Sequence, residues 1–230
     1  MPDEFLALPI ASAREIAADQ TLFTFDWPTA YARAYTTPGQ FVKLAHGEAK
    51  PGFYVLASHP GESPAHLLIK ESSEATAALR RLPAGTVLNM TAPMGKGFPL
   101  DKAKGKEVLL LAAGSGIAAI RPVLGYIQRH REAFGPVHLL YGERGAERFA
   151  FQEDLAGWAA DGIAVHCCVS GPANGAAFGK KGYVQEILGS LALDTANTVG
   201  FICGMENMVV GCKAAFEGLG GDPAQLYLNY

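Results

Sequence analysis

Cysteine is scarce in this chain, and its spacing excludes the common metal clusters. Only four of the 230 residues are cysteine, Cys167, Cys168, Cys203 and Cys212, and no two of them form a C-x-x-C pair. Structural zinc and iron–sulfur sites are built on such pairs, so neither is expected. The six histidines are scattered without metal-ligand spacing, and we predict no metal site. Unpaired thiols also fit a reducing compartment.

The chain also lacks an excess of either charge, a long hydrophobic run and a secretory signal. Its 19 basic and 22 acidic residues give a net charge of −3 and form no basic run, so nucleic acid is not an expected partner. The longest charge-free, mainly apolar stretch, 108–120, is too short for the ~20 residues of a membrane-spanning helix. The N-terminal residues carry two acids and no long apolar core. We expect a soluble protein of the cytoplasm, or of the chloroplast stroma after loss of a transit peptide.

Short apolar runs broken by proline and glycine fill the first hundred residues. The whole chain is 49% hydrophobic and 18% charged, which is enough apolar material for one large or two compact domains. Runs of β-type residues separated by Pro and Gly turns favour an antiparallel barrel. A single helix is expected at 73–81, where alanine and leucine follow a capping Ser73. The runs expected as strands are 21–25, 40–44, 54–57, 66–70 and 87–91.

After residue 106 the pattern changes to nearly continuous apolar runs that alternate with helical stretches. Strands buried on both faces and alternating with helices indicate a parallel α/β sheet. The expected strands are 108–113, 137–141, 163–169 and 199–203, and the expected helices are 117–131, 149–160, 181–191 and 206–219. The charged and small segment 101–105 is the natural linker. We therefore divide the chain into an antiparallel β-barrel domain at 1–100 and a Rossmann-like α/β domain at 101–230.

A Gly-Ser-Gly sequence joins the first strand of the second half to its helix. Gly114, Ser115 and Gly116 follow the apolar run 108–113 and precede Ile117. Glycine lets a ligand approach the backbone closely, and the N–H groups that open a helix attract phosphate. A tight strand-to-helix turn without any ligand fits the same residues, because short glycine motifs are weak signals when taken alone. The spacing differs from the G-x-S-x-G of a serine hydrolase, which we exclude.

Eight segments, in the same order, resemble those of the ferredoxin–NADP reductase superfamily, in which a flavin barrel precedes a pyridine-nucleotide domain. They are Pro38-Gly39-Gln40-Phe41, Tyr54 with Ala57-Ser58, Ser73-Glu74-Ala75-Thr76, Pro93 to Phe98, Gly114 to Ala118, Tyr141 to Arg144, Cys203 to Met208, and the terminal aromatic Tyr230. The resemblance covers nearly the whole chain and points to a plant-type branch of the superfamily. It implies that the chain binds FAD and a pyridine nucleotide and transfers a hydride between them.

The resemblance also implies a role for individual residues in both halves. The barrel residues that would hold FAD are Tyr54, Val55, Ala57, Ser58 and Thr76. The residues of the second half that would hold the nucleotide are Gly114, Ser115, Gly116, Ile117, Gly204 and Met208. The catalytic positions implied are Cys203, beside the nicotinamide C4, and Tyr230, stacked against the isoalloxazine ring.

Two arginines follow the second expected strand of the α/β half. Arg144 and Arg148 stand where a nucleotide-binding crevice is expected, and they suit the 2′-phosphate of NADP(H). Glu143 and Glu147 beside them weaken that preference. We therefore expect NADP as the coenzyme, and NAD stays open.

The chain departs from the family pattern in its flavin-binding motif. Gly52 stands where the family has an arginine that pairs with the FAD pyrophosphate, and Val55 stands where it has serine or threonine. A lost charge-assisted contact costs roughly 1.5–3 kcal/mol, which corresponds to about 10–150-fold in affinity. Lys50 or Lys70 would have to supply the missing cation.

Two functions follow from the sequence. The first is a flavoprotein oxidoreductase that passes a hydride from NAD(P)H to FAD and electrons on to a separate protein or small-molecule acceptor. The second is a reductase-like domain with weakened flavin binding that serves as a binding or assembly subunit of a larger complex. The absent arginine favours the second, whereas the intact Cys203-Gly204 and glycine turn favour the first.

Overall fold

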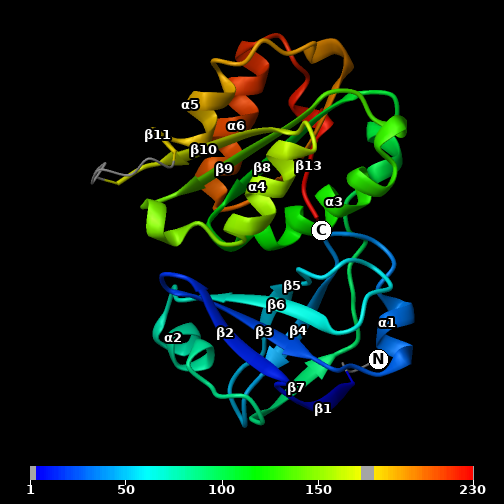
Figure 1. Cartoon of the computed structure of the whole chain (residues 1–230), viewed down its shortest axis with the longest axis vertical. Helices are drawn as coiled ribbons and strands as arrows, with labels where there is room; N and C mark the ends of the chain where they lie inside the picture. Colours follow the sequence, from blue (N-terminus) through cyan, green and yellow to red (C-terminus); the bar gives the residue numbers. More distant parts are fainter. Residues whose placement is uncertain (1–3, 172–178, 230) are drawn as a thin grey trace.

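Antiparallel sheets form the first part of the chain and a parallel sheet forms the rest, one stacked above the other in Figure 1. This computed structural model describes residues 4–171 and 179–229. One antiparallel sheet has the strand order β1-β7-β4-β5 and the other has the order β2-β3-β6. A bridge between Leu56 and Leu67 links the two, so that together they form a barrel-like lobe. Its elements are β1 (Phe5–Pro9), β2 (Ser12–Ala17), β3 (Gln20–Phe25), α1 (Thr29–Ala34), β4 (Phe41–Ala45), β5 (Gly52–Val55), β6 (Ala65–Lys70), α2 (Glu74–Arg80) and β7 (Val87–Thr91).

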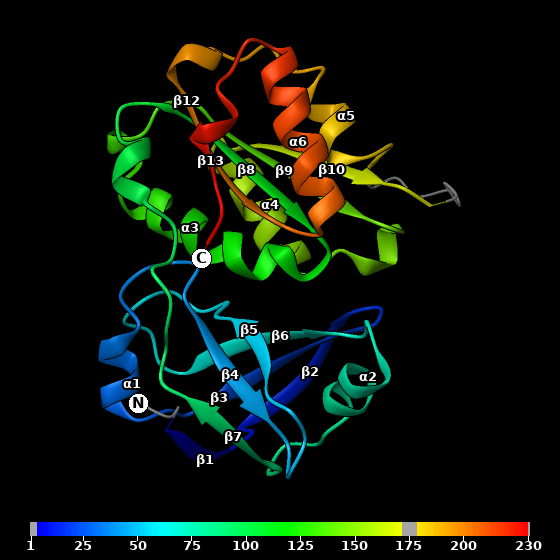
Figure 2. The same cartoon turned by 180° about the vertical axis from the view of Figure 1, so that it is seen from behind.

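The parallel sheet has six strands in the order β11-β10-β9-β8-β12-β13, with helices on both faces (Figures 1 and 2). Helices α3 and α4 cover one face, and α5 and α6 cover the other. The elements are β8 (Glu107–Ala113), α3 (Ile117–Arg129), β9 (Val137–Glu143), α4 (Gln152–Ala160), β10 (Ala164–Val169), β11 (Lys180–Lys181), α5 (Val184–Leu188), β12 (Thr198–Cys203), α6 (Glu206–Gly218) and β13 (Leu226–Tyr227).

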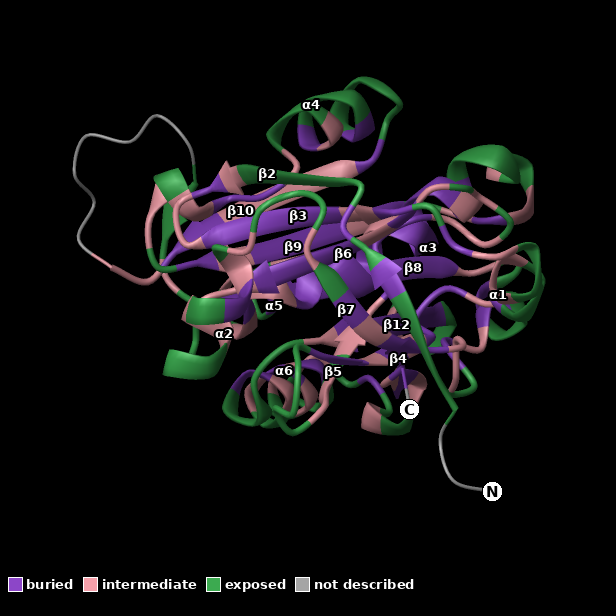
Figure 3. Cartoon of the chain, turned by 90° about the horizontal axis from the view of Figure 1, so that it is seen from below, coloured by how far each residue is buried: buried purple, intermediate pink, exposed green. Residues whose placement is uncertain are grey.

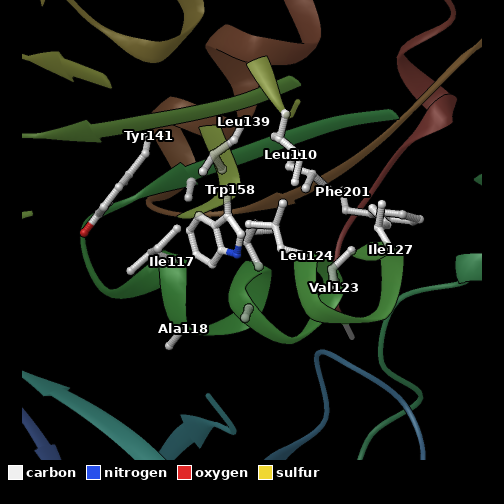
Figure 4. Close-up of a cluster of buried hydrophobic side chains, with 14 of the residues drawn as sticks. Leu110, Ile117, Ala118, Val123, Leu124, Ile127, Leu139, Tyr141, Trp158 and Phe201 are labelled. Carbon is white, nitrogen blue, oxygen red and sulfur yellow. The ribbon is translucent and has the colours of Figure 1, made fainter. Parts of the chain in front are cut away.

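Alternate residues of the central strand serve the two faces of the parallel sheet. Leu110 of β8 packs in the core beneath α3 and α4, whereas Leu109 and Leu111 pack beneath α5 and α6. A strand buried on both faces has to be apolar at every position, which explains the continuous leucine run. Figure 4 shows the first of these cores, where Leu124 of α3 and Trp158 of α4 meet the sheet. In Figure 3 the strands are mainly buried and the outer faces of the helices are exposed.

The two lobes share packing as well as hydrogen bonds. Ala57, Leu68 and Phe98 of the barrel side belong to the same buried cluster as the residues of α3. The Arg121 guanidinium of α3 donates to the carbonyl oxygen of Ala57 at 2.8 Å. After β13 the chain returns to the barrel, where Asn229 Nδ2 donates to the carbonyl oxygen of Gly39 at 2.9 Å. The mouth of the barrel and one end of the parallel sheet therefore face each other in a fixed arrangement.

The fold class predicted from the sequence is confirmed. All nine strands expected in the two halves are present, with ends shifted by a few residues, and the helix expected at 73–81 is α2. Strands β1 and β2 and helix α1 were not predicted. Strand β2 is exposed at most positions and so lacks the apolar run by which a strand is recognised. The division of the chain at residue 100 stays a prediction.

The helices of the second half differ in length from those predicted. Helix α4 begins at Gln152 rather than at 149, because Phe151 has a left-handed backbone with a φ of 58°. The helix expected at 181–191 is shorter, since its first residue, Lys181, pairs with β10 as part of β11 and helix α5 occupies Val184–Leu188. A short strand close to the end of the chain, β13, pairs in parallel with β12.

Candidate functional site

A cleft of about 770 Å³ lies between the barrel and the parallel sheet. Its walls come from β5 and β6 of the barrel and from the carboxyl ends of β8, β9 and β12. Open α/β sheets bind ligands at this edge, and the volume is that of a small-molecule site. Eleven of the residues predicted from the sequence line the cleft: Tyr54, Val55, Lys70, Gly114, Ser115, Gly116, Arg144, Arg148, Cys203, Gly204 and Met208.

The turn between β8 and α3 packs directly on the end of β12. A Cβ atom on Gly116 would lie 2.1 Å from the carbonyl oxygen of Cys203, so only glycine fits there. Helix α3 has no side-chain cap at its N-terminus. An anionic group is a suitable partner for the N–H groups that open such a helix. The backbone here is a close-fitting cradle of the kind that nucleotide phosphates occupy.

Cys203 ends β12 at the floor of the cleft. Burial raises the pKa of its thiol to about 11, so the side chain is neutral at physiological pH. A neutral thiol is a weak nucleophile. Gly204 follows it, and Met208 packs so closely that a Cβ atom on Gly204 would lie 2.4 Å from its sulfur. The Cys-Gly pair is thus enclosed on the side of α6.

Glu143 ends β9 and carries a buried carboxylate. Its side chain is 1% exposed. Lys70 of the barrel donates to both carboxylate oxygens, at 2.9 and 2.7 Å, and Gln20 Nε2 donates to Oε1 at 2.9 Å. The Tyr141 hydroxyl donates to Oε1 at 3.2 Å, and burial together with the Glu143 charge raises the pKa of Tyr141 well above its usual range. The buried charge is therefore fully compensated, as such a group requires.

The loop that follows β9 carries the two predicted arginines. Arg148 forms an ion pair with Asp19, which lies in the turn between β2 and β3. The backbone holds the two segments together, because Ala18 N donates to the carbonyl oxygen of Glu147 at 2.9 Å. Arg144 is exposed at the mouth of the cleft. Both predicted arginines thus line the cleft, and Arg148 is bound to a carboxylate.

Tyr54 lies on the barrel wall of the cleft, and its ring folds back over Gly52. A Cβ atom on Gly52 would lie 2.9 Å from the Tyr54 ring. Burial raises the pKa of the Tyr54 phenol. The Tyr54 ring therefore occupies the space that a side chain at residue 52 would need.

Four predicted residues do not line the cleft. Ala57 and Ser58 are fully buried in the barrel lobe, where the Ser58 carbonyl oxygen accepts from the Tyr35 hydroxyl at 2.8 Å. Thr76 is used in capping α2, since its hydroxyl oxygen accepts from Ser72 N and Ser73 N. Ile117 is buried in the core under α3 (Figure 4). Tyr230 lies outside the described residues. The cofactor roles given to these residues stay predictions.

The structure adds residues to the cleft that sequence reasoning missed. They are Asp19, Phe53, Glu71, Ser72, Cys168, Tyr183 and Met205 among others. Phe53, Tyr183 and Met205 are 66%, 54% and 68% exposed, so they form an apolar part of the rim, beside the exposed polar residues Ser72, Arg144 and Asn207. A carboxylate at the end of the second parallel strand is a recognised nucleotide signal, and Glu143 could have been found by it. Nothing in the local sequence marks Asp19.

Two classes of site are not seen in the part of the chain that the structure describes. Within residues 4–171 and 179–229, no group of three or more His, Cys, Asp or Glu side chains is placed to hold a metal ion. Within the same ranges, no helix has the length and apolar character needed to cross a membrane.

Comparisons with known proteins agree with this geometry. Residues 110–214 match the family described as oxidoreductase NAD-binding domain. The chain is 28% identical to sulfhydrogenase 1 subunit gamma of Pyrococcus furiosus, over 86% of this chain and 68% of that protein. It is also 28% identical to fruit protein pKIWI502 of Actinidia deliciosa, over 76% of this chain and 60% of that protein, which agrees with the plant-type resemblance.

A solved structure supports the same fold. The ferredoxin NADP+ reductase of Neisseria gonorrhoeae, crystallised with FAD and NADP, superposes with a TM-score of 0.83 over 98% of both chains at 19% identity. The overall arrangement of the antiparallel and parallel sheets is thus shared with that protein. The chain thus has the fold of that ferredoxin NADP+ reductase, and its residues 110–214 match the oxidoreductase NAD-binding domain family.

Proposed function

We propose that the chain is a flavin-dependent oxidoreductase that takes a hydride from a reduced pyridine nucleotide and passes electrons to a separate acceptor. The observation that carries the proposal is the composition of the cleft. One wall is the barrel strand with Tyr54 and Val55, and the other is formed by the Gly114–Gly116 turn and by Cys203 with Gly204. A flavin on the first wall and a nicotinamide on the second would face each other in the same space.

The residues present fit both groups. The cradle at Gly116 is closed by the backbone of β12, and the uncapped N-terminus of α3 suits the nucleotide pyrophosphate. The half-buried Tyr54 ring offers an aromatic face for a planar ring system. When bound, FAD accepts a hydride and releases electrons one or two at a time, and the protein supplies orientation and shielding.

The protein's own residues would act by position and polarity. Cys203 remains protonated because burial raises its pKa to about 11, so it presents a compact, uncharged contact to the reacting ring. Met208 packs against the Cys-Gly turn and fills the space on the Cβ side of Gly204.

The acceptor would be a separate molecule. One relative is a subunit of a larger enzyme by its name, sulfhydrogenase 1 subunit gamma. By analogy, we propose that this chain delivers electrons to a partner protein within a complex. The exposed apolar rim of Phe53, Tyr183 and Met205 supports an opening that another molecule covers.

A second function is favoured by a specific observation. The Tyr54 ring lies over Gly52, where the family arginine would stand, and Lys70 is already bound to Glu143. Weaker attraction for the FAD pyrophosphate would leave a nucleotide-binding or assembly subunit that holds flavin only loosely.

Identification of the bound cofactor separates the two functions. The protein is purified without added flavin, heated, and the released cofactor is identified by chromatography and absorption. Reduction of an artificial acceptor is then measured with NADH and NADPH. Released FAD together with activity supports the oxidoreductase. Absence of flavin, with no binding of added FAD in fluorescence titration, supports the second function.

A pair of cysteine variants sharpens this test. Cys203→Ala should slow flavin reduction at least several-fold while the flavin content is unchanged, because the packing at the nicotinamide is lost. Cys212→Ala serves as the matched control, since that residue is fully buried on α6 and does not line the cleft. Equal effects of both variants would argue against a role for Cys203.

A further inference from the structure

The cleft is lined by as many acidic as basic side chains. The acids are Asp19, Glu71 and Glu143, and the bases are Lys70, Arg144 and Arg148. A nucleotide or a phosphorylated flavin brings negative charge into such a site, and proteins meet that charge with cations or with free N–H groups. Whether a cation of the cleft is available to a phosphate therefore decides which part of a cofactor the cleft can hold.

Two of the three cations are already held by carboxylates. Lys70 Nζ lies 2.9 and 2.7 Å from the two carboxylate oxygens of Glu143, whose side chain is 1% exposed. Arg148 donates to Asp19, and its Nε lies 3.4 Å from Oε1 of Glu147. The first group is formally neutral and the second is negative, so neither attracts a phosphate strongly. Drawing Lys70 away would also leave a buried carboxylate without its cation, which is costly.

The third cation, Arg144, belongs to the opposite wall. It follows β9 of the parallel sheet and is exposed at the mouth of the cleft, so it can serve an anion on the sheet side. Among the described residues that line the cleft, Lys70 is the one cation that the barrel supplies. The barrel wall therefore meets a ligand with no uncompensated positive charge.

The start of α2 is the other place on the barrel side where an anion would look for donors. Its N–H groups are satisfied internally, because Ser72 N and Ser73 N donate to the Thr76 hydroxyl oxygen at 2.8 and 2.9 Å, and Thr76 N donates to Ser73 Oγ at 3.2 Å. Arg80 of the same helix donates to Glu71 at 2.8 Å. A phosphate would have to break this cap to gain its donors, and the cap itself stabilises the helix.

The same wall is well suited to an uncharged planar ring. Phe53, Tyr54 and Val55 of β5 and Leu68 of β6 line it. The Tyr54 ring fills the space above Gly52, where a Cβ atom would lie 2.9 Å from it. Aromatic and apolar contacts of this kind contribute affinity through buried area and stacking and need no charge on the ligand. The barrel wall thus offers contacts for a ring system and few for a phosphate.

Building on the proposed flavin-dependent function, we propose that the barrel wall binds a flavin through its ring system alone, so that riboflavin, FMN and FAD are held with similar affinity. The cause is the missing cation at Gly52 together with the compensation of Lys70 by Glu143. One charge-assisted contact to a phosphate corresponds to about tenfold or more in affinity. A site that read the phosphate would separate FMN from riboflavin by at least that factor.

Equilibrium dialysis of the full chain, purified without added flavin, measures this through the flavin absorption. We expect the dissociation constants of riboflavin, FMN and FAD to lie within about threefold of one another. Salt gives a second readout, because screening weakens contacts between charges and not the stacking of the ring. The ratio of FMN to riboflavin affinity should change less than about twofold between about 0.05 and about 0.5 M NaCl.

Two variants of residue 52 separate charge from shape. Gly52→Arg should raise the ratio of FMN to riboflavin affinity at least about tenfold. Gly52→Met displaces the Tyr54 ring in the same way but brings no charge, so it should leave that ratio as it is in the wild type. Thermal melting of each variant reports whether it folds, and the comparison of the three flavins on the wild type needs neither variant.

The outcomes distinguish this inference from the function on which it rests. FMN or FAD binding to the wild type at least about tenfold more tightly than riboflavin overturns the inference and leaves the flavin-dependent function standing. A ratio that Gly52→Arg leaves unchanged also overturns it, because the missing cation would then not be the cause. Failure of the wild type to bind any of the three flavins overturns the proposed function itself.

Discussion

The ammonium of Lys70 lies 2.7 Å from Oε2 of Glu143 and joins the last residue of β6 in the barrel to the last residue of β9 in the parallel sheet. The Lys70 side chain is 19% exposed and that of Glu143 is 1% exposed. The pair also stands beside the glycine turn, because a Cβ atom on Gly114 would lie 3.3 Å from the Lys70 nitrogen. The contact therefore couples the geometry of the cleft to the docking of the two lobes.

Breaking this pair from one side should destabilise the protein strongly. Lys70→Met leaves the Glu143 carboxylate buried without its cation, a change that typically costs about 3–5 kcal/mol. The double variant Lys70→Met with Glu143→Leu removes both charges and should recover most of the loss. Urea unfolding measures the free energy of each variant.

A solvent-exposed pair provides the control for that experiment. Lys104 and Asp101 lie 2.6 Å apart with side chains that are 51% and 86% exposed, and Lys104→Met should leave the free energy of unfolding unchanged within error. A Lys70→Met protein as stable as the wild type would show that the pair between the lobes is not needed for stability.

Alanine at two glycines should have opposite effects. Gly116→Ala places a methyl group against the backbone of Cys203, 2.1 Å from its carbonyl oxygen, and should destabilise by about 1–3 kcal/mol. Gly157→Ala lies within α4 with open space around the new methyl group and should stabilise by about 0.5–1 kcal/mol. Thermal unfolding followed by circular dichroism distinguishes the signs. A Gly116→Ala protein with unchanged stability and unchanged NAD⁺ binding would show that the β12 end moves freely.

Stability should fall as the pH drops below about 6.5, the usual pKa of histidine. Burial, with the charge of Arg121 as the next cause, lowers the pKa of His66, and burial also lowers the pKa of His59 and His166. In this pH range the unfolded chain binds more protons than the folded protein, so the free energy of unfolding rises with pH and is lost on acidification. His66→Gln should reduce that slope, whereas His46→Gln, at an exposed position, should not. Equal slopes for the wild type and His66→Gln would contradict the assignment.

Much of the parallel sheet was predictable because the local sequence pattern determines where its strands, turns and helices lie. A strand such as β8 is apolar throughout and ends in the Gly114–Gly116 turn, so the sequence alone marks strand, turn and helix. Because β8 and β12 are neighbours in register, with Ala112 opposite Cys203, the glycine turn and the Cys-Gly pair must meet at one edge. The meeting of the glycine turn with the Cys-Gly pair therefore follows from the sequence pattern alone.

The contacts that tune the site were not predictable, since they depend on how the lobes dock. Asp19 lies in a turn after the largely exposed β2, and nothing near it in the sequence indicates Arg148, more than a hundred residues later. Lys70 was expected to meet a cofactor and lines the cleft, but the sequence does not show that its ammonium also binds Glu143. Likewise, Thr76 was expected to hold FAD, and in the structure its side chain takes part in the N-terminal cap of α2. Local patterns do not show such competition between partners.

Restoring the missing arginine of the flavin motif should tighten flavin binding. Gly52→Arg adds a cation to the barrel side of the cleft, where Lys70 is already bound to Glu143. A charge-assisted contact to the FAD pyrophosphate corresponds to about 1.5–3 kcal/mol, or about 10–150-fold in affinity. Part of this gain is offset, because any side chain at residue 52 must displace the Tyr54 ring, which lies 2.9 Å from the place of the new Cβ atom.

A matched variant separates the charge from the displacement of the ring. Gly52→Met moves Tyr54 as Gly52→Arg does, but it brings no charge, so it reports the cost of displacement alone. Fluorescence titration with FAD should give the order of affinity Gly52→Arg, then wild type, then Gly52→Met. The difference between the two variants should decrease with added salt, since the added contact is electrostatic and partly exposed. If Gly52→Met binds FAD as tightly as Gly52→Arg at low salt, the position of Tyr54 rather than the absent cation limits flavin binding in this chain.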